Sequence, residues 1–190
     1  TQWQPGLGFG ATLRHYWAYY VATSFAWDAA GALFNALLIL VTGAGGSIGL
    51  ELSRQLAERG DQVISVSRKS SPELAALGVR TFDGVDVTDR QALDSVSAEL
   101  GDTTLDILIN NAGWTSLVAH HDLEALTDEI FQKTFEVNVW GTWALTKAAM
   151  PLLKKSDDGN VVTITSIAGV RPVGSSIAYS MSKAALNHMT

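Results

Sequence analysis

The fold is decided by residues 37–49, which read LLILVTGAGGSIG. The continuous apolar run 37–41 is typical of a strand buried on both faces of a parallel sheet. Glycines follow it at once, and apolar residues then recur at helical spacing from Ile48 to Leu56, until the pattern stops at Gly60. The segment predicts a strand, a tight turn and a helix, in which the turn's backbone can approach an anion at the helix N-terminus.

The same alternation of apolar runs and helical patterns continues along the chain. Thr88, with Gln91 three residues later, forms a capping-box pattern that opens a helix. Further strands are predicted at 63–67, 79–82, 105–109 and 161–165, and helices at 73–77, from 88 onward, and at 127–153. Five strands with intervening helices predict an α/β fold, a Rossmann-like doubly wound parallel sheet with right-handed crossovers.

Composition excludes several classes of function. The 190 residues carry a net charge of −6, so no surface is expected to neutralise a nucleic-acid backbone. The chain has no cysteine, which excludes disulfides and thiolate metal sites, and its four histidines lack the spacing typical of a zinc site. No metal is predicted, and an organic cofactor is favoured.

The first 36 residues differ from the rest of the chain. They contain nine of the 16 aromatic residues, and only the side chains of Arg14 and Asp28 carry a formal charge. Residues 16–41 are long enough to span a bilayer, but Asp28 near the centre is costly in lipid, and the last residues are needed for the first strand. A cleaved secretory signal fits poorly because the apolar stretch is too long. An amphipathic or buried helix is favoured, with a membrane helix and a junction artefact as alternatives.

Ligands of doubly wound sheets bind beyond the carboxyl ends of the strands, so functional residues should follow strands. The motif Asn110-Asn111-Ala112-Gly113 follows the fourth predicted strand, Asn138 lies in the long helix, and Ser166 follows the fifth strand. Tyr179 and Lys183 are four residues apart, so they would share one face of a helix. These positions are the candidates for a catalytic site.

A tyrosine beside a lysine suits acid–base chemistry. A phenol, with an ordinary pKa of about 10, exchanges protons poorly at neutral pH unless a nearby positive charge favours its anion. Lys183 can supply that charge to Tyr179, and Ser166 can hydrogen-bond a substrate oxygen. Asn138 can hold a water that links Lys183 to solvent. Taken singly, Tyr179 and Lys183 could be a surface pair, Ser166 a turn residue and Asn138 an ordinary buried amide. Their joint spacing favours a catalytic site.

The stretch 37–190 resembles the short-chain dehydrogenase/reductase family, in the branch that carries Asn-Asn-Ala-Gly and Tyr-x-x-x-Lys motifs. The family's glycine pattern is Thr-Gly, three residues, Gly-x-Gly, and Ser47 stands where its middle glycine is usual. The resemblance implies an NAD(P)-binding domain over 37–190, with Asp86 contacting adenine and Asn110 lining the cofactor cleft. The composition separates the leader over 1–36 from this domain. The catalytic residues implied by the resemblance are Asn138, Ser166, Tyr179 and Lys183. Its implied cofactor-binding residues are Thr42, Gly43, Gly45, Gly46, Ser47, Ile48, Gly49, Ser67, Arg68, Asp86, Val87, Asn110, Ala112, Gly113, Tyr179 and Lys183.

The choice of cofactor is predicted from the end of the second strand. An acidic residue there would accept hydrogen bonds from an unmodified ribose and repel a 2′-phosphate. The sequence instead has Ser67-Arg68-Lys69, whose two cations can pair with a phosphate. NADP(H) is therefore favoured over NAD(H), whereas a merely solvated basic turn would leave the preference open.

The resemblance implies an oxidoreductase that interconverts a small carbonyl compound and a secondary alcohol by hydride transfer, with Tyr179 as general acid/base. Family members continue past the catalytic helix whereas this sequence stops at Thr190. We therefore expect a truncated family member with a sheet incomplete at its C-terminal edge, and a homo-oligomer for the full-length protein. The alternatives are a catalytically incompetent nucleotide-binding fragment and a membrane-anchored reductase. We expect a cytoplasmic protein, or one associated with a membrane through residues 16–36.

Overall fold

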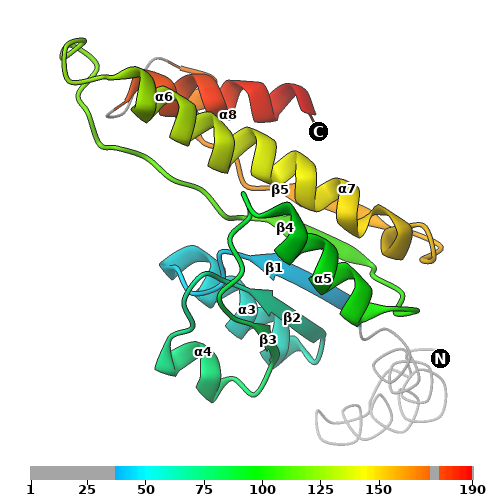
Figure 1. The fold of residues 1–190 in the computed structure, drawn as a ribbon. Helices are drawn as coiled ribbons and strands as arrows, with labels where there is room; N and C mark the ends of the chain where they lie inside the picture. Colours follow the sequence, from blue (N-terminus) through cyan, green and yellow to red (C-terminus); the bar gives the residue numbers. More distant parts are fainter. Residues whose placement is uncertain (1–36, 172–175, 190) are drawn as a thin grey trace, which may run out of the picture. The chain divides into compact units, whose positions relative to one another are not determined.

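A five-stranded parallel sheet forms the centre of the computed structural model, which describes residues 37–171 and 176–189 (Figure 1). The strands lie in the order β3-β2-β1-β4-β5. Their bounds are β1 (Leu38–Thr42), β2 (Gln62–Val66), β3 (Arg80–Phe82), β4 (Ile107–Asn110) and β5 (Asn160–Thr163). This order confirms the predicted Rossmann-like parallel sheet. The strand order reverses at β1, so the loops after β1 and β4 lie next to each other.

Each predicted strand overlaps an observed one, with ends displaced by one or two residues. The agreement follows from the apolar runs. Those of β1, β2 and β4 are buried, as expected for strands that are covered on both faces, whereas Val161 and Val162 of the edge strand β5 are exposed. The predictions for the aromatic-rich segment 1–36, including its membrane alternative, lie outside the described residues.

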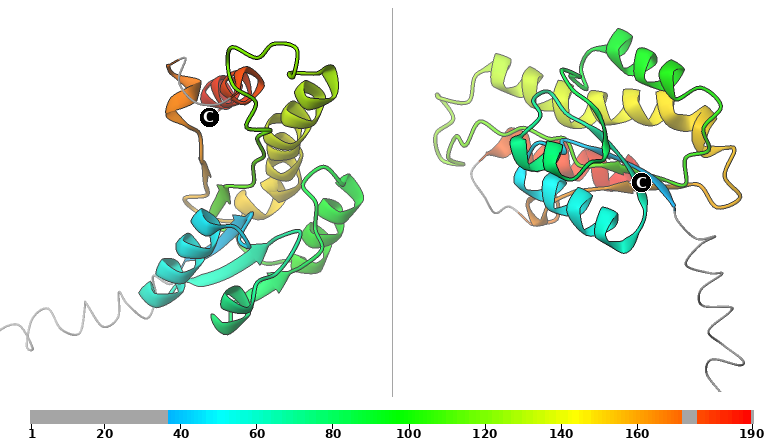
Figure 2. Two further views of the ribbon diagram at one scale, coloured as in Figure 1. Left: turned by 90° about the vertical axis from the view of Figure 1, so that its left-hand side faces the viewer. Right: turned by 90° about the horizontal axis from the view of Figure 1, so that it is seen from below.

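Helices cover both faces of the sheet. On one face, Leu40 and Leu108 pack with apolar residues of α5 (Arg90–Leu100) and α7 (Thr142–Leu153). On the other face, Ile39 and Val41 pack with α3 (Ser47–Arg59) and α4 (Pro72–Ala76). The right-hand view of Figure 2 shows α5 and α7 on one side of the sheet and α3 on the other. Alternate residues of β1 therefore pack into two separate hydrophobic cores, because successive side chains of a strand point to opposite faces of the sheet.

The remaining helices gather at the carboxyl end of the sheet. They are α6 (Asp128–Phe135), the π-helical turn η1 (Glu136–Gly141), the 3-10 turn η2 (Ile167–Gly169) and α8 (Ile177–Met189). α8 packs beside α6 and η1 and against η2. No described helix combines the length and apolar character that a membrane span needs.

The helix predicted to begin at Thr88 begins instead after Asp89. The Asp89 carboxylate accepts hydrogen bonds from the main-chain N–H groups of Gln91 and Ala92, at 2.9 and 3.1 Å, and so caps α5. The Thr88 hydroxyl is used elsewhere, because it donates to Asp86 at 2.8 Å. The capping-box prediction was therefore wrong by one residue.

The predicted helix 127–153 is interrupted by η1. Its start agrees with the prediction to one residue: α6 begins at Asp128, and Thr127 caps it by accepting a hydrogen bond from the N–H of Ile130. The π-helical turn then adds a residue to the helical repeat, and the main-chain oxygen of Asn138 accepts a hydrogen bond from the Thr142 hydroxyl at 2.7 Å. The turn lies where the sequence placed a catalytic candidate, Asn138.

Replacement of Asp89 by alanine tests the observed cap. We expect Asp89→Ala to lower the free energy of unfolding by about 1 kcal/mol, because two N–H groups lose their acceptor. Asp94→Ala is the matched control, because it removes the same charge from an exposed position within the same helix. Denaturant unfolding measures both variants, and equal effects of the two would contradict the assignment of the cap.

Candidate functional site

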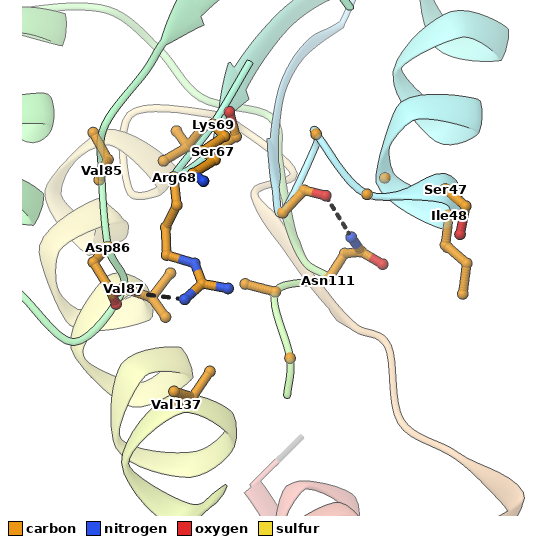
Figure 3. A pocket seen from close by; sticks show the side chains of 17 residues that line it. Ser47, Ile48, Ser67, Arg68, Lys69, Val85, Asp86, Val87, Asn111 and Val137 are labelled. Atoms are coloured by element: carbon orange, nitrogen blue, oxygen red, sulfur yellow. Dashed lines mark hydrogen bonds and ion pairs between the residues drawn. The ribbon is translucent and has the colours of Figure 1, made fainter. Parts of the chain in front are cut away.

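A cleft of about 650 Å³ opens at the carboxyl ends of β1, β2 and β4 (Figure 3). Most of the predicted cofactor-binding residues line it, and they come from four separate loops, those after β1, β2, β3 and β4. These residues are Gly43, Gly45, Gly46, Ser47, Ile48, Gly49, Ser67, Arg68, Asp86, Val87, Ala112 and Gly113. The position where the strand order reverses thus brings together loops that are far apart in the sequence.

The loop after β1 depends on glycine for close backbone approach. A Cβ atom at Gly45 would overlap the main-chain oxygen of Lys69, and one at Gly49 would overlap the main-chain oxygen of Gly43. Gly43 itself has a φ of 64°. Ser47 is exposed, begins α3 and has no positive φ, so its position makes no such demand for glycine.

The start of α3 has the features of an anion-binding site. Its N-cap residue, Gly46, makes no side-chain capping hydrogen bond, and the first turn of the helix lines the cleft. The unpaired N–H groups and the helix dipole of such a terminus attract phosphate groups. The buried hydroxyl of Ser67 also lines the cleft and has no hydrogen-bond partner among the described residues. Both features fit a dinucleotide cofactor.

Arg68 and Asp86 face each other across one end of the cleft (Figure 3). The Arg68 Nη1 atom lies 3.8 Å from Asp86 Oδ2, and the other carboxylate oxygen accepts two hydrogen bonds from Thr88. Burial alone would raise the pKa of Asp86, but the Thr88 bonds and the charges of Arg68 and Lys133 outweigh it and hold the pKa below its ordinary value. A carboxylate acceptor, Asp86, and an exposed guanidinium donor, Arg68, therefore both line this end of the cleft.

Four predicted cofactor residues do not line the cleft: Tyr179 and Lys183 of α8, and Thr42 and Asn110, which lie at the ends of β1 and β4. The Thr42 hydroxyl donates to the Ile109 oxygen and accepts from the N–H groups of Asn111 and Ala112. Asn110 is buried with its amide donating to Thr146 Oγ1 at 3.0 Å, on the side of the sheet covered by α7. Both residues support the cleft from within the sheet.

Asn111 lines the cleft but was missing from the predicted set. Its side-chain amide donates to the Thr42 oxygen at 2.9 Å, and Figure 3 shows it between the loops after β1 and β4. Strand alternation could have identified it, because Leu108 and Asn110 share the face toward α7 and the next residue leaves that face. Val66, Val85 and Val137 also line the cleft and were not predicted to do so, whereas Lys69, another lining residue, was predicted as a cation that can pair with a phosphate.

Tyr179 and Lys183 lie on one face of α8, as their spacing predicts. The Lys183 ammonium is 5.7 Å from the centre of the Tyr179 ring and donates to the Ile164 oxygen at 2.7 Å. Lys183 is 4% exposed, and this burial lowers the pKa of its ammonium. Ser166, two residues after Ile164, accepts a hydrogen bond from the N–H of Ala168 and so caps η2, which packs on α8.

Asn138 is fully buried and its amide is bonded to protein groups. Oδ1 accepts from the N–H of Trp114 at 2.7 Å, and Nδ2 donates to the Trp114 oxygen and to Ser182 Oγ. Both N–H groups are thereby used, and the water-holding role of Asn138 stays a prediction. Trp114 and Ser182 are partners that the sequence pattern did not reveal.

The cleft and the catalytic candidates meet at Gly113. This residue lines the cleft, and a Cβ atom there would lie 3.5 Å from Asn138 Oδ1 and 3.7 Å from Lys183 Nζ. The end of the cleft at Gly113 thus adjoins the buried lysine, whereas Arg68 and Asp86 lie at the end formed by the loops after β2 and β3. Neither Tyr179 nor Lys183 itself lines the cleft.

Comparison with known sequences identifies the family. The model of the short chain dehydrogenase family matches residues 37–190. The chain is 40% identical over 156 residues to a Streptomyces violaceoruber protein assigned as ketoacyl reductase 2 of granaticin polyketide synthase. This match covers 78% of the chain and 62% of the relative. Across such curated relatives, the chain spans between 51% and 64% of their length.

Solved structures show the same fold with either form of the cofactor. NAD⁺-bound xylitol dehydrogenase superposes with a TM-score of 0.71 at 30% identity, over 83% of this chain and 63% of that one. A short-chain dehydrogenase from Escherichia coli CFT073 complexed with NADPH gives a TM-score of 0.72 at 27% identity, over 83% and 70%. Fold, motifs and sequence similarity agree, and the chain belongs to the short-chain dehydrogenase/reductase family.

Proposed function

We propose that the protein is an NADP(H)-dependent oxidoreductase that interconverts a carbonyl compound and a secondary alcohol. The observation that carries the proposal is the buried ammonium of Lys183 beside the Tyr179 ring, at the end of a cleft that fits a dinucleotide. Among the described residues no carboxylate pairs with Lys183, whose one hydrogen bond goes to a main-chain oxygen. Its charge is therefore available to the phenol.

Different residues of the cleft would bind different parts of the cofactor. The first turn of α3 and the glycines before it would bind the pyrophosphate, and Asp86 and Val87 would flank the adenine ring. Arg68 would pair with a 2′-phosphate, since no acidic residue stands at the end of β2 to repel it. Lys183 would hold the hydroxyl groups of the nicotinamide ribose.

Tyr179 would transfer the proton that the reaction requires. When bound, the cofactor supplies or accepts a hydride. In the reducing direction the Tyr179 hydroxyl donates its proton to the substrate oxygen, and in the oxidising direction the phenolate removes it. The Lys183 ammonium lowers the cost of the phenolate, because charges interact strongly in a site shielded from water. The Ser166 hydroxyl would hold the same substrate oxygen.

The function is tested by assay of NADPH consumption against a panel of ketones, and of NADP⁺ reduction by secondary alcohols. Ketoacyl esters belong in the panel because the Streptomyces violaceoruber relative is assigned as a ketoacyl reductase. Turnover of at least one compound is expected. Binding of NADPH without conversion of any compound would favour the alternative of a nucleotide-binding protein that does not catalyse.

Arg68→Ala tests the preference for NADPH. We expect NADPH affinity to fall by about 10- to 100-fold, since a charge-assisted contact with the phosphate is lost, while NADH affinity stays within about twofold. Lys147→Ala removes one positive charge from an exposed site on α7 and is the control. Fluorescence titration measures all affinities. Tighter or equal binding of NADH by the wild-type protein would refute the preference.

Tyr179→Phe tests the acid–base role. The substitution keeps the ring and removes the titrating oxygen, so kcat should fall by at least about a hundredfold while NADPH affinity is kept. Lys183→Ala should damage both turnover and cofactor binding. Steady-state kinetics and titration separate the two effects, and retained turnover in the phenylalanine variant would refute the mechanism.

The burial of Lys183 predicts a pH-dependent stability. Its folded pKa lies below the ordinary value of 10.5, so on raising the pH the folded chain loses this proton before the unfolded chain does. The unfolded state then binds more protons, and the contribution of Lys183 to stability rises with pH up to about 10.5. It is least favourable at lower pH, where the buried group is charged.

Lys183→Met provides the measurement, with both chains also carrying Tyr179→Phe so that the neighbouring phenol does not titrate. The free energy of unfolding of the lysine chain minus that of the methionine chain should increase between neutral and alkaline pH. Denaturant unfolding at several pH values gives the difference. A constant difference would mean that Lys183 titrates alike in both states.

A further inference from the structure

Ser182 lies on α8 between Tyr179 and Lys183, and its side chain is fully buried. Its Oγ accepts a hydrogen bond from Asn138 Nδ2 at 2.9 Å and donates one to the main-chain oxygen of Tyr179 at 2.7 Å. The proposed proton transfer uses neither bond. A buried hydroxyl that both accepts and donates a hydrogen bond fixes the two groups that it joins.

Asn138 extends this connection to the loop after β4. Its amide contacts the main chain of Trp114 twice, through Oδ1 and the N–H group at 2.7 Å and through Nδ2 and the carbonyl oxygen at 3.0 Å. Trp114 directly follows Gly113, the residue at which the cleft meets Lys183. One continuous series of hydrogen bonds therefore runs from the cleft through η1 to the helix of the acid–base pair.

We propose that Ser182 is a positioning residue for the reaction, whose hydroxyl sets the placement of α8 relative to the cleft by joining Asn138 to the main chain of Tyr179. The inference rests on the proposed function, because placement matters only if Tyr179 acts on a substrate beside the cofactor. Ser182 itself touches no reacting atom.

The physical reason is the cost of an unbonded N–H group in a buried site. Without the Ser182 hydroxyl, Asn138 keeps one N–H without an acceptor, and it can relieve that cost only by turning its amide away from Trp114. Tyr179 and Lys183 share one helix, so their mutual spacing survives this change. What changes is their distance from the cleft, and small displacements of reacting groups reduce rates strongly.

Ser182→Ala tests the proposal against a matched control on the same helix. Ser180 also donates its hydroxyl to a main-chain oxygen, that of Ser176 at 3.1 Å, but it has no bond to Asn138. We expect Ser182→Ala to lower kcat about tenfold, to leave NADPH affinity within about twofold and to raise the isotope effect with deuterated NADPH. Ser180→Ala should leave all three values unchanged, and Ser182→Thr, which keeps the hydroxyl, should restore most of kcat.

Hydrogen exchange of the Trp114 amide tests the same connection without turnover. We expect faster exchange in Ser182→Ala than in the wild type and in Ser180→Ala, with the amide of the β4 core residue Leu108 as the reference for global unfolding. The proposal would be overturned if Ser182→Ala kept the wild-type kcat, or if its Trp114 amide exchanged at the wild-type rate. It would also be overturned if Ser180→Ala lowered kcat as much as Ser182→Ala does. Absence of turnover in the wild type would instead refute the proposed function, and the exchange measurement would still decide whether Ser182 holds Asn138.

Discussion

The hydroxyl group of Thr42 joins the two loops on which the site is built. It is almost completely buried at the end of β1, where it donates to the Ile109 oxygen and accepts from the N–H groups of Asn111 and Ala112. A buried hydroxyl with three partners cannot shift without leaving polar groups unpaired. The loops after β1 and β4 therefore keep one separation. The two loops lie so close together that a Cβ atom at Gly43 would be 3.0 Å from Ala112 Cα.

The two ends of the site differ in their exposure to water, and this difference suits their tasks. Arg68 is largely exposed, so its ion pair with Asp86 at 3.8 Å is weak and can be exchanged for a phosphate. Lys183 is buried, and a main-chain oxygen fixes its ammonium without neutralising it. The proposed function uses the exposed end to bind a phosphate and the buried end to place a positive charge beside the Tyr179 ring.

Sequence alone predicted the features whose cause is local. The five strands follow from apolar runs bounded by glycine, and α3 ends at Gly60 with a φ of 96°, a conformation that favours glycine. The loop of the cleft follows from glycines that allow backbone contact. The start of α5 was misplaced because Thr88 and Asp89 can both cap a helix. The choice between them depends on Asp86, which accepts the Thr88 hydroxyl and leaves Asp89 to cap.

The features that sequence could not predict depend on contacts between distant residues. Asn138 is bonded to Trp114, 24 positions away, and to Ser182, 44 positions away. Asn138 lies in the π-helical turn η1, and the apolar pattern of residues 127–153 does not indicate that turn. Spacing along α8 gives the pairing of Tyr179 with Lys183, because both lie on one helix, but it says nothing of what holds that helix against the cleft. Only the tertiary structure shows that Ser182, between Tyr179 and Lys183, is bonded to Asn138 and so connects α8 to the loop after β4.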